Sequence, residues 1–79
     1  MKIAVVSDHK RFDDFIKFYR YPKEYFKCVS KLRDAREIQF DHYIKLYTHL
    51  DLYDCVEELK IHRVPQITME SLKELFHIS

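Results

Sequence analysis

The chain has 79 residues, of which 34% are charged and 47% hydrophobic, with a formal net charge of +1 and no glycine. This length fits one small domain, expected to span residues 1–79, and the hydrophobic content excludes a disordered chain. Most backbone cradles for phosphate need glycine for a positive φ or for close approach to the ligand. The lack of glycine therefore argues against the usual nucleotide-binding loops.

The first part of the chain predicts a strand followed by a helix. Residues 2–6 form a continuous apolar run, which is typical of a strand covered on both faces in a parallel sheet. Ser7 or Asp8 can cap the next helix, because a short polar side chain accepts a hydrogen bond from its first turn. The apolar positions of that helix, spaced i, i+3, i+4 and i+7, are Phe12, Phe15, Ile16 and Tyr19. We expect Pro22 to end the helix.

The middle of the chain predicts two further strands. Residues 25–30 and 43–48 are rich in aromatic and β-branched side chains, as strands are, and one short helical turn at 31–37 separates them. In the later strand Ile44 and Leu46 fall on the same face, because successive side chains of a strand alternate.

The last third predicts two helices. The inner positions of a helix from about 51 to 62 are Leu52, Cys55, Val56 and Leu59. Residues 64–67 predict a short edge strand, where Pro65 is tolerated, and Thr68 caps a final helix. Its inward residues are Met69, Leu72 and Phe76. The alternation of strands and amphipathic helices predicts an α/β fold with a small three- to four-stranded, mainly parallel sheet flanked by helices.

Charge is unevenly distributed along the chain. Residues 1–33 carry nine Lys or Arg and four Asp or Glu, whereas residues 34–79 carry five and nine. Such asymmetry is typical of a face for an anionic partner or of surfaces that associate head to tail, unless the two halves interleave in space. Six Phe and six Tyr in so short a chain also leave aromatic surface exposed, so we expect a protein partner or a homo-oligomer.

The cysteines and histidines predict no cofactor or metal site. Cys28 and Cys55 have neither metal nor redox spacing, and the five histidines form no zinc-binding pattern. No apolar run reaches the length of a secretory signal or a membrane helix. We expect a cytoplasmic protein with reduced, buried thiols and no cofactor.

Residues 5–9, Val-Val-Ser-Asp-His, resemble the start of calcineurin-like metallophosphoesterases, whose first strand ends in an Asp-x-His metal pair. Here Asp8 and His9 are adjacent, and the later glycine-containing motifs of that family are missing. A metal-dependent hydrolase centred on Asp8 is therefore kept as a second alternative. The preferred role of Asp8 is a helix cap.

Residues 34–47, DAREIQFDHYIKLY, resemble the D-x-A-R-G-I-D-F…V-I-x-Y segment of the second RecA-like domain of superfamily 2 helicases. The likeness spans roughly residues 2–60, and similar strings occur in short bacteriophage proteins with a reduced Rossmann-like core. The resemblance implies that architecture. Glu37 and Gln39 replace the family's glycine and aspartate, and the chain has no Walker A lysine, so ATPase activity is not carried over.

Residues 10–27 interleave basic and aromatic side chains, a combination that single-stranded nucleic acids bind. Phe12 and Tyr19 are needed on the inner face of their helix. Candidates for exposure are therefore Phe18, Tyr21 and Tyr25. A nucleic-acid-binding accessory protein that uses residues 10–27 is therefore the first alternative.

The preferred prediction is a small non-catalytic module that binds a partner protein. The resemblance to bacteriophage proteins implies a phage-encoded inhibitor or modulator of a host protein, acting in the host cytoplasm. The expected contact patch consists of Phe18, Tyr21 and Tyr25, rimmed by Lys17 and Arg20.

Overall fold

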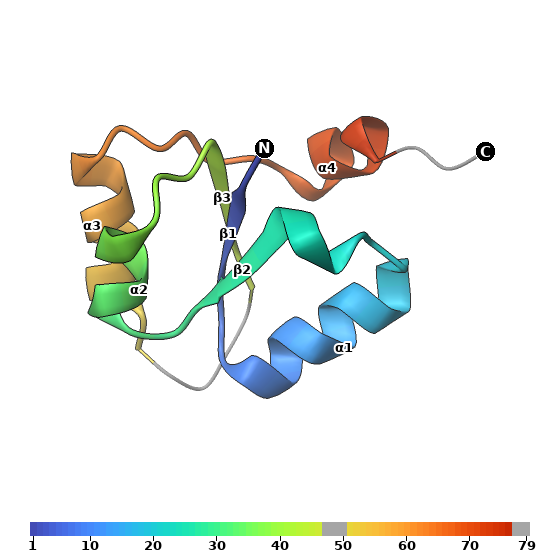
Figure 1. The fold of residues 1–79 in the computed structure, drawn as a ribbon, viewed down its shortest axis with the longest axis horizontal. Helices are drawn as coiled ribbons and strands as arrows, with labels where there is room; N and C mark the ends of the chain where they lie inside the picture. The colour runs from blue at the N-terminus through green and yellow to red at the C-terminus, as the bar shows by residue number, and fades with distance from the viewer. Residues whose placement is uncertain (47–50, 77–79) are drawn as a thin grey trace.

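The computed structural model describes residues 1–46 and 51–76, and within them it shows a three-stranded parallel sheet (Figure 1). The strands β1 (Ile3–Val6), β2 (Phe26–Val29) and β3 (His42–Lys45) lie in the order β2-β1-β3. The helices are α1 (His9–Tyr19), α2 (Leu32–Glu37), α3 (Tyr53–Ile61) and α4 (Met69–Leu75), with a 3-10 turn η1 (Lys23–Tyr25). The predicted small α/β fold is confirmed.

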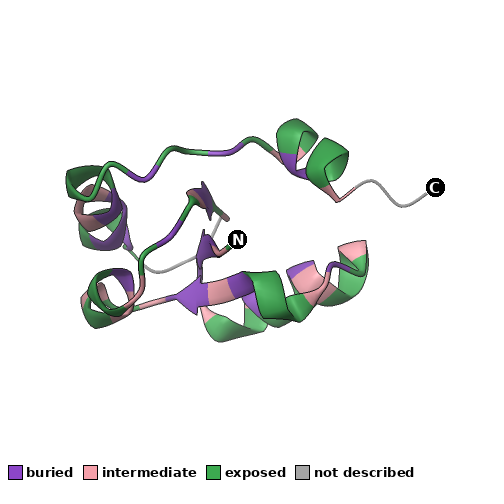
Figure 2. Cartoon of the chain, turned by 45° about the horizontal axis from the view of Figure 1, so that its top comes forward, coloured by how far each residue is buried: buried purple, intermediate pink, exposed green. Residues whose placement is uncertain are grey.

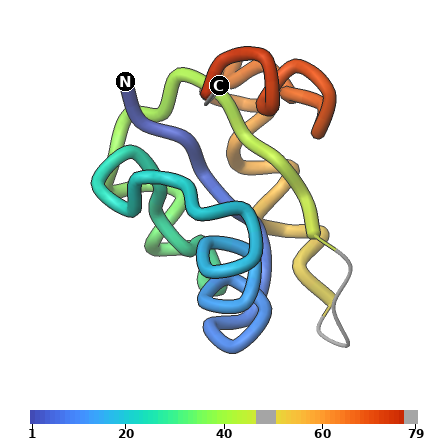
Figure 3. The backbone as a smooth tube through the Cα atoms, turned by 90° about the vertical axis from the view of Figure 1, so that its right-hand side faces the viewer, coloured from blue at the N-terminus to red at the C-terminus, as the bar shows by residue number. Residues whose placement is uncertain are grey.

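The central strand β1 is buried on both faces, as its unbroken apolar run predicts (Figure 2). Ala4 and Val6 belong to the core beneath α2 and α3, whereas Ile3 and Val5 belong to the core beneath α1 and α4. The molecule therefore has three layers, with the sheet in the middle. Figures 1 and 3 both place α4 at the end of the molecule where β1 begins.

The two strand-to-strand crossovers run in opposite directions along the sheet. The first leads through α1 from β1 to β2, and the second leads through α2 from β2 past β1 to β3. Two such crossovers have the same hand only when their helices cover opposite faces of the sheet. This is the arrangement observed, because Phe12 and Phe15 of α1 join one core while Ala35 of α2 joins the other.

Several predicted boundaries are wrong. The helix α1 ends at Tyr19 and not at Pro22, because Arg20 adopts a left-handed conformation with φ of 56°. Tyr25 lies in η1, so β2 begins one residue later than predicted. The third strand covers His42–Lys45, and the predicted strand residues 47 and 48 lie outside the described residues.

The predicted edge strand at 64–67 is reduced to a single parallel bridge between Tyr43 and Gln66. Tyr43 N donates to the carbonyl of Pro65 at 3.0 Å, and Ile67 N donates to the carbonyl of Tyr43 at 2.8 Å. Pro65 has no N–H to donate, so the parallel pairing cannot continue toward residue 41. The segment therefore ties the chain to β3 without forming a fourth strand.

The last two helices confirm the predicted apolar spacing. The inner residues of α3, including Cys55 and Leu59, are buried. Thr68 caps α4 by accepting a hydrogen bond from Ser71 N at 3.1 Å, and Leu72 is fully buried beneath it. Within residues 1–46 and 51–76, no helix has the length and apolar character needed to cross a membrane.

Candidate partner-binding surface

A groove of about 560 Å³ runs along α1 and is bordered by Leu46, which follows β3. Its lining residues are Arg11, Asp14, Phe15, Lys17, Phe18, Tyr19 and Leu46. The side chain of Phe18 is 79% exposed, the highest value among the large hydrophobic side chains that the structure describes. A largely exposed aromatic ring beside a concave surface is typical of a docking site.

The start of α1 determines which residues face the groove. Asp8 Oδ1 accepts a hydrogen bond from Arg11 N at 2.8 Å, so the helix begins at His9 and Asp8 is the predicted helix cap. From that start, Phe12 and Phe15 point to the core. Phe18 lies seven residues after Arg11, so helical periodicity brings both to one outer stripe.

Asp8 shows no sign of a metal-binding cluster around it. Within the described ranges, no group of three or more His, Cys, Asp or Glu side chains could hold a metal ion. Besides capping α1, the Asp8 carboxylate lies 3.8 Å from Arg11 Nε. The hydrolase alternative therefore gains no support from the geometry of this carboxylate.

The rim of the groove carries more positive than negative charge. Arg11 and Lys17 face a single carboxylate, Asp14, among the lining residues. Lys73 of α4 adds a further cation, with its ammonium nitrogen 5.8 Å from the centre of the Tyr19 ring. An acidic partner surface would complement this rim.

The structure brings part of the predicted patch together. Lys17 and Phe18 both line the groove, and Arg20 is exposed at the C-terminal end of α1. Tyr25 is 38% exposed, but its ring contacts Phe76 with centroids 5.7 Å apart and it does not line the groove.

The expectation that Tyr21 is exposed is wrong, because only 7% of this residue is accessible. Its ring stacks on Tyr19 at 5.3 Å and on Phe26 at 5.5 Å, and both pairs are nearly parallel. Burial raises the pKa of the Tyr21 hydroxyl, and the neighbouring Tyr19 adds to that effect. Tyr21 therefore belongs to the core, and Phe18 and Tyr25 are the exposed rings of residues 10–27.

Sequence reasoning missed Arg11, Asp14 and Leu46 as parts of the site. Asp14 lies four residues before Phe18, so helical spacing alone places it beside that ring. Leu46 comes from a different element, and no local pattern predicts that the end of β3 borders a groove on α1.

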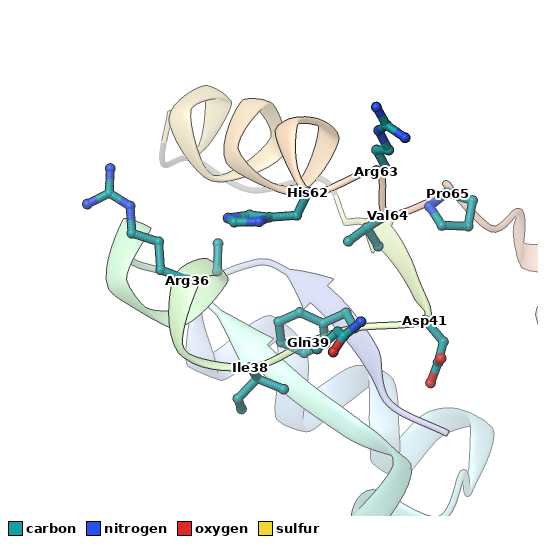
Figure 4. Close-up of a pocket in the computed structure, with 10 residues that line it drawn as sticks. Arg36, Ile38, Gln39, Asp41, His62, Arg63, Val64 and Pro65 are labelled. Atoms are coloured by element: carbon teal, nitrogen blue, oxygen red, sulfur yellow. The ribbon is translucent and has the colours of Figure 1, made fainter.

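A second cavity, of about 420 Å³, lies before the start of β3, between the C-terminal ends of α2 and α3 (Figure 4). His62 and Val64 point into it, whereas Arg63 and Asp41 point away. Asp41 has a structural role: its carboxylate accepts a hydrogen bond from the backbone N of Lys2 at 2.8 Å, which links the start of β3 to the start of the chain.

An ion-pair cluster at the mouth of this cavity joins α2 to α3. Arg36 Nε donates to Glu58 Oε1 at 2.7 Å, and His62 Nε2 lies 3.5 Å from the same oxygen. The hydrogen bond from Arg36 lowers the pKa of Glu58. Arg36 and Glu58 thus compensate each other, and we take the groove on α1 as the stronger candidate site.

Comparison with protein-family models, with curated proteins and with solved structures gives no match to the chain. The resemblances to helicase domains and to short bacteriophage proteins stay predictions.

Proposed function

We propose that the protein is a non-catalytic module that binds a partner protein through its α1 face, defined as Arg11, Asp14, Lys17 and Phe18. The observation that carries this proposal is the 79% exposure of Phe18 at the edge of the groove. Burying a phenylalanine side chain completely contributes about 1.5–3 kcal/mol. One such ring is enough to anchor a short contact, because a few residues supply most of the energy of an interface.

The dimensions and charge of the α1 face define the partner. The 11 residues of α1 span about 16 Å, which matches a short helix or an extended segment of a few residues. The segment would place an apolar side chain against Phe18 and carboxylates toward Lys17 and Arg11. A module of this kind acts by covering its partner's surface, so we propose an inhibitor or modulator. A phage-encoded one would act on a host protein in the host cytoplasm.

The experiment compares proteins captured from a host lysate by the wild-type chain and by two variants. Phe18→Ser removes the anchor and should abolish capture of the specific partner. Ile61→Ser is the matched control, because Ile61 is 71% exposed but lies at the end of α3 on the opposite side of the sheet. Capture that is the same with Phe18→Ser as with wild type would overturn the proposal.

The salt dependence of binding separates this function from nucleic-acid binding. Contacts to phosphates release counterions, so the affinity for a single-stranded oligonucleotide would fall steeply as salt rises. Docking around Phe18 combines one apolar anchor with the two cations Lys17 and Arg11, so its affinity should fall less steeply with salt. Tight, strongly salt-dependent binding of the oligonucleotide that Phe18→Ser removes would favour the nucleic-acid alternative instead.

A further inference from the structure

Two exposed apolar side chains lie near the two ends of α3. Tyr53 is 60% exposed and Ile61 is 71% exposed, although the opposite side of the same helix is buried. Tyr53, Glu57 and Ile61 are spaced four residues apart, so helical periodicity places them along one side. We call Tyr53, Asp54, Glu57 and Ile61 the α3 face.

The charge of the α3 face is opposite to that of the α1 face. The exposed or half-exposed acids Asp51, Asp54 and Glu57 outnumber Lys60, which already lies 3.5 Å from Glu57. On the α1 face, Arg11 and Lys17 outnumber the carboxylate of Asp14. Arg11 itself already lies 3.8 Å from the carboxylate of Asp8. Each face therefore combines a highly exposed apolar side chain with a surplus of charge that the other would neutralise.

The two faces cannot meet within one molecule. α1 covers one side of the sheet and α3 covers the other (Figure 1). A contact between them must join two copies, head to tail, and each copy keeps one face free for the next. The lengths agree, since the 9 residues of α3 span about 13 Å and the 11 of α1 about 16 Å.

We propose that the α3 face of one copy docks on the α1 face of a second copy. Phe18 then contacts Ile61, while Lys17 faces Glu57. A stable interface buries about 800 Å² on each partner, which exceeds what two such short helices can cover. The association is therefore reversible and depends on protein concentration.

Self-association would regulate the module, because a second copy and the partner protein compete for the same α1 face. This competition rests on the proposed function, whereas the self-association itself does not. A high concentration of the chain would hide the α1 face, and dilution would release it.

The test measures mass by sedimentation velocity over a range of concentrations. The mass of the wild-type chain should rise with concentration, whereas Phe18→Ser alone and Ile61→Ser alone should remain monomeric. An equimolar mixture of the two variants should form dimers and nothing larger. In that mixture the intact α1 face of Ile61→Ser meets the intact α3 face of Phe18→Ser, and the remaining faces are both damaged.

Charge exchange gives a second, independent measurement. Lys17→Glu and Glu57→Lys should each weaken self-association, and the chain that carries both substitutions should regain it. Circular dichroism of every variant checks that the fold is unchanged. We expect no change, because Lys17, Phe18 and Ile61 are exposed and Glu57 is half-exposed. A monomeric wild type at every concentration, a mixture that stays monomeric, or a double variant without recovery would overturn the inference.

These outcomes are independent of the proposed function. If Ile61→Ser is monomeric and still captures the partner protein, both statements stand. If the wild type never self-associates while capture still depends on Phe18, only the inference of a second copy fails. If the chain self-associates and the variants mix as predicted, but capture of the partner does not depend on Phe18, the inference of a second copy stands and the proposed function fails.

Discussion

Arg20 and Arg63 occupy equivalent positions, each being the left-handed residue that follows a helix. Their φ angles are 56° and 60°, and they are the two residues with positive φ in the described part of the chain. Tyr21 N donates to the carbonyl of Ile16, and Val64 N donates to that of Leu59, which is the hydrogen bond of a Schellman motif in both cases. Glycine normally fills this position, so a chain without glycine has placed arginine there twice.

Replacing either arginine by glycine should stabilise the protein. A left-handed conformation costs a residue with a Cβ about 1–2 kcal/mol, part of which the greater freedom of glycine in the unfolded chain offsets. We expect Arg20→Gly and Arg63→Gly each to gain about 0.5–1 kcal/mol, seen as a melting temperature a few degrees higher. Lys17→Gly, inside α1, is the control and should lower stability by about 1 kcal/mol. Melting temperatures of the arginine variants at or below that of the wild type would contradict this assignment.

The Tyr21 hydroxyl is buried, and it has no hydrogen-bond partner among the residues that the structure describes. An unpaired buried hydroxyl costs about 1–3 kcal/mol, so Tyr21→Phe should leave stability unchanged or raise it. Tyr21→Ser should cost about 3 kcal/mol or more, because it removes the ring from the stack with Tyr19 and Phe26. Urea unfolding followed by circular dichroism measures both changes. Equal stability of Tyr21→Ser and wild type would place this ring outside the core.

The Arg36–Glu58 pair predicts a pH dependence of stability. The pKa of Glu58 is lowered from its ordinary value of 4.5 in the folded protein, first by the hydrogen bond from Arg36. The ionised carboxylate therefore stabilises the fold at pH values above 4.5, and this contribution is lost as the pH falls through the lower folded pKa. In Glu58→Gln, the melting temperature should fall less steeply below that pH than in the wild type. Glu57→Gln is the control. If the melting temperatures of Glu58→Gln and wild type fall equally as the pH is lowered, the pair does not have this role.

The helix α4 should be part of the cooperative fold. Leu72 is fully buried beneath it, and Leu72→Ala should cost about 2–5 kcal/mol by leaving a cavity. Leu75 lies on the same helix but is 47% exposed, so Leu75→Ala should change stability by less than about 0.5 kcal/mol. The comparison uses the midpoint of urea unfolding. Similar midpoints for the two variants would mean that α4 folds apart from the sheet.

Local patterns were sufficient to predict the elements with strong periodicity. The apolar run of β1, the cap at Asp8 and the inward positions of α1 are all properties of short stretches of chain. The same is true of the exposed ring of Phe18, because the side of α1 that carries Phe12 and Phe15 must face the sheet. Alternation and helical spacing act over a few residues, so a single sequence displays them directly.

Contacts between distant segments decided the rest. Tyr21 and Tyr25 are only four residues apart, yet Tyr21 is buried because Phe26 of β2 and Phe76, which follows α4, pack against it. Leu46 borders the groove only because the strand order brings the end of β3 close to α1. Periodicity determines which side of an element is apolar. The packing of one element on another determines which of those side chains remain accessible to a partner, because burial depends on what lies across the interface.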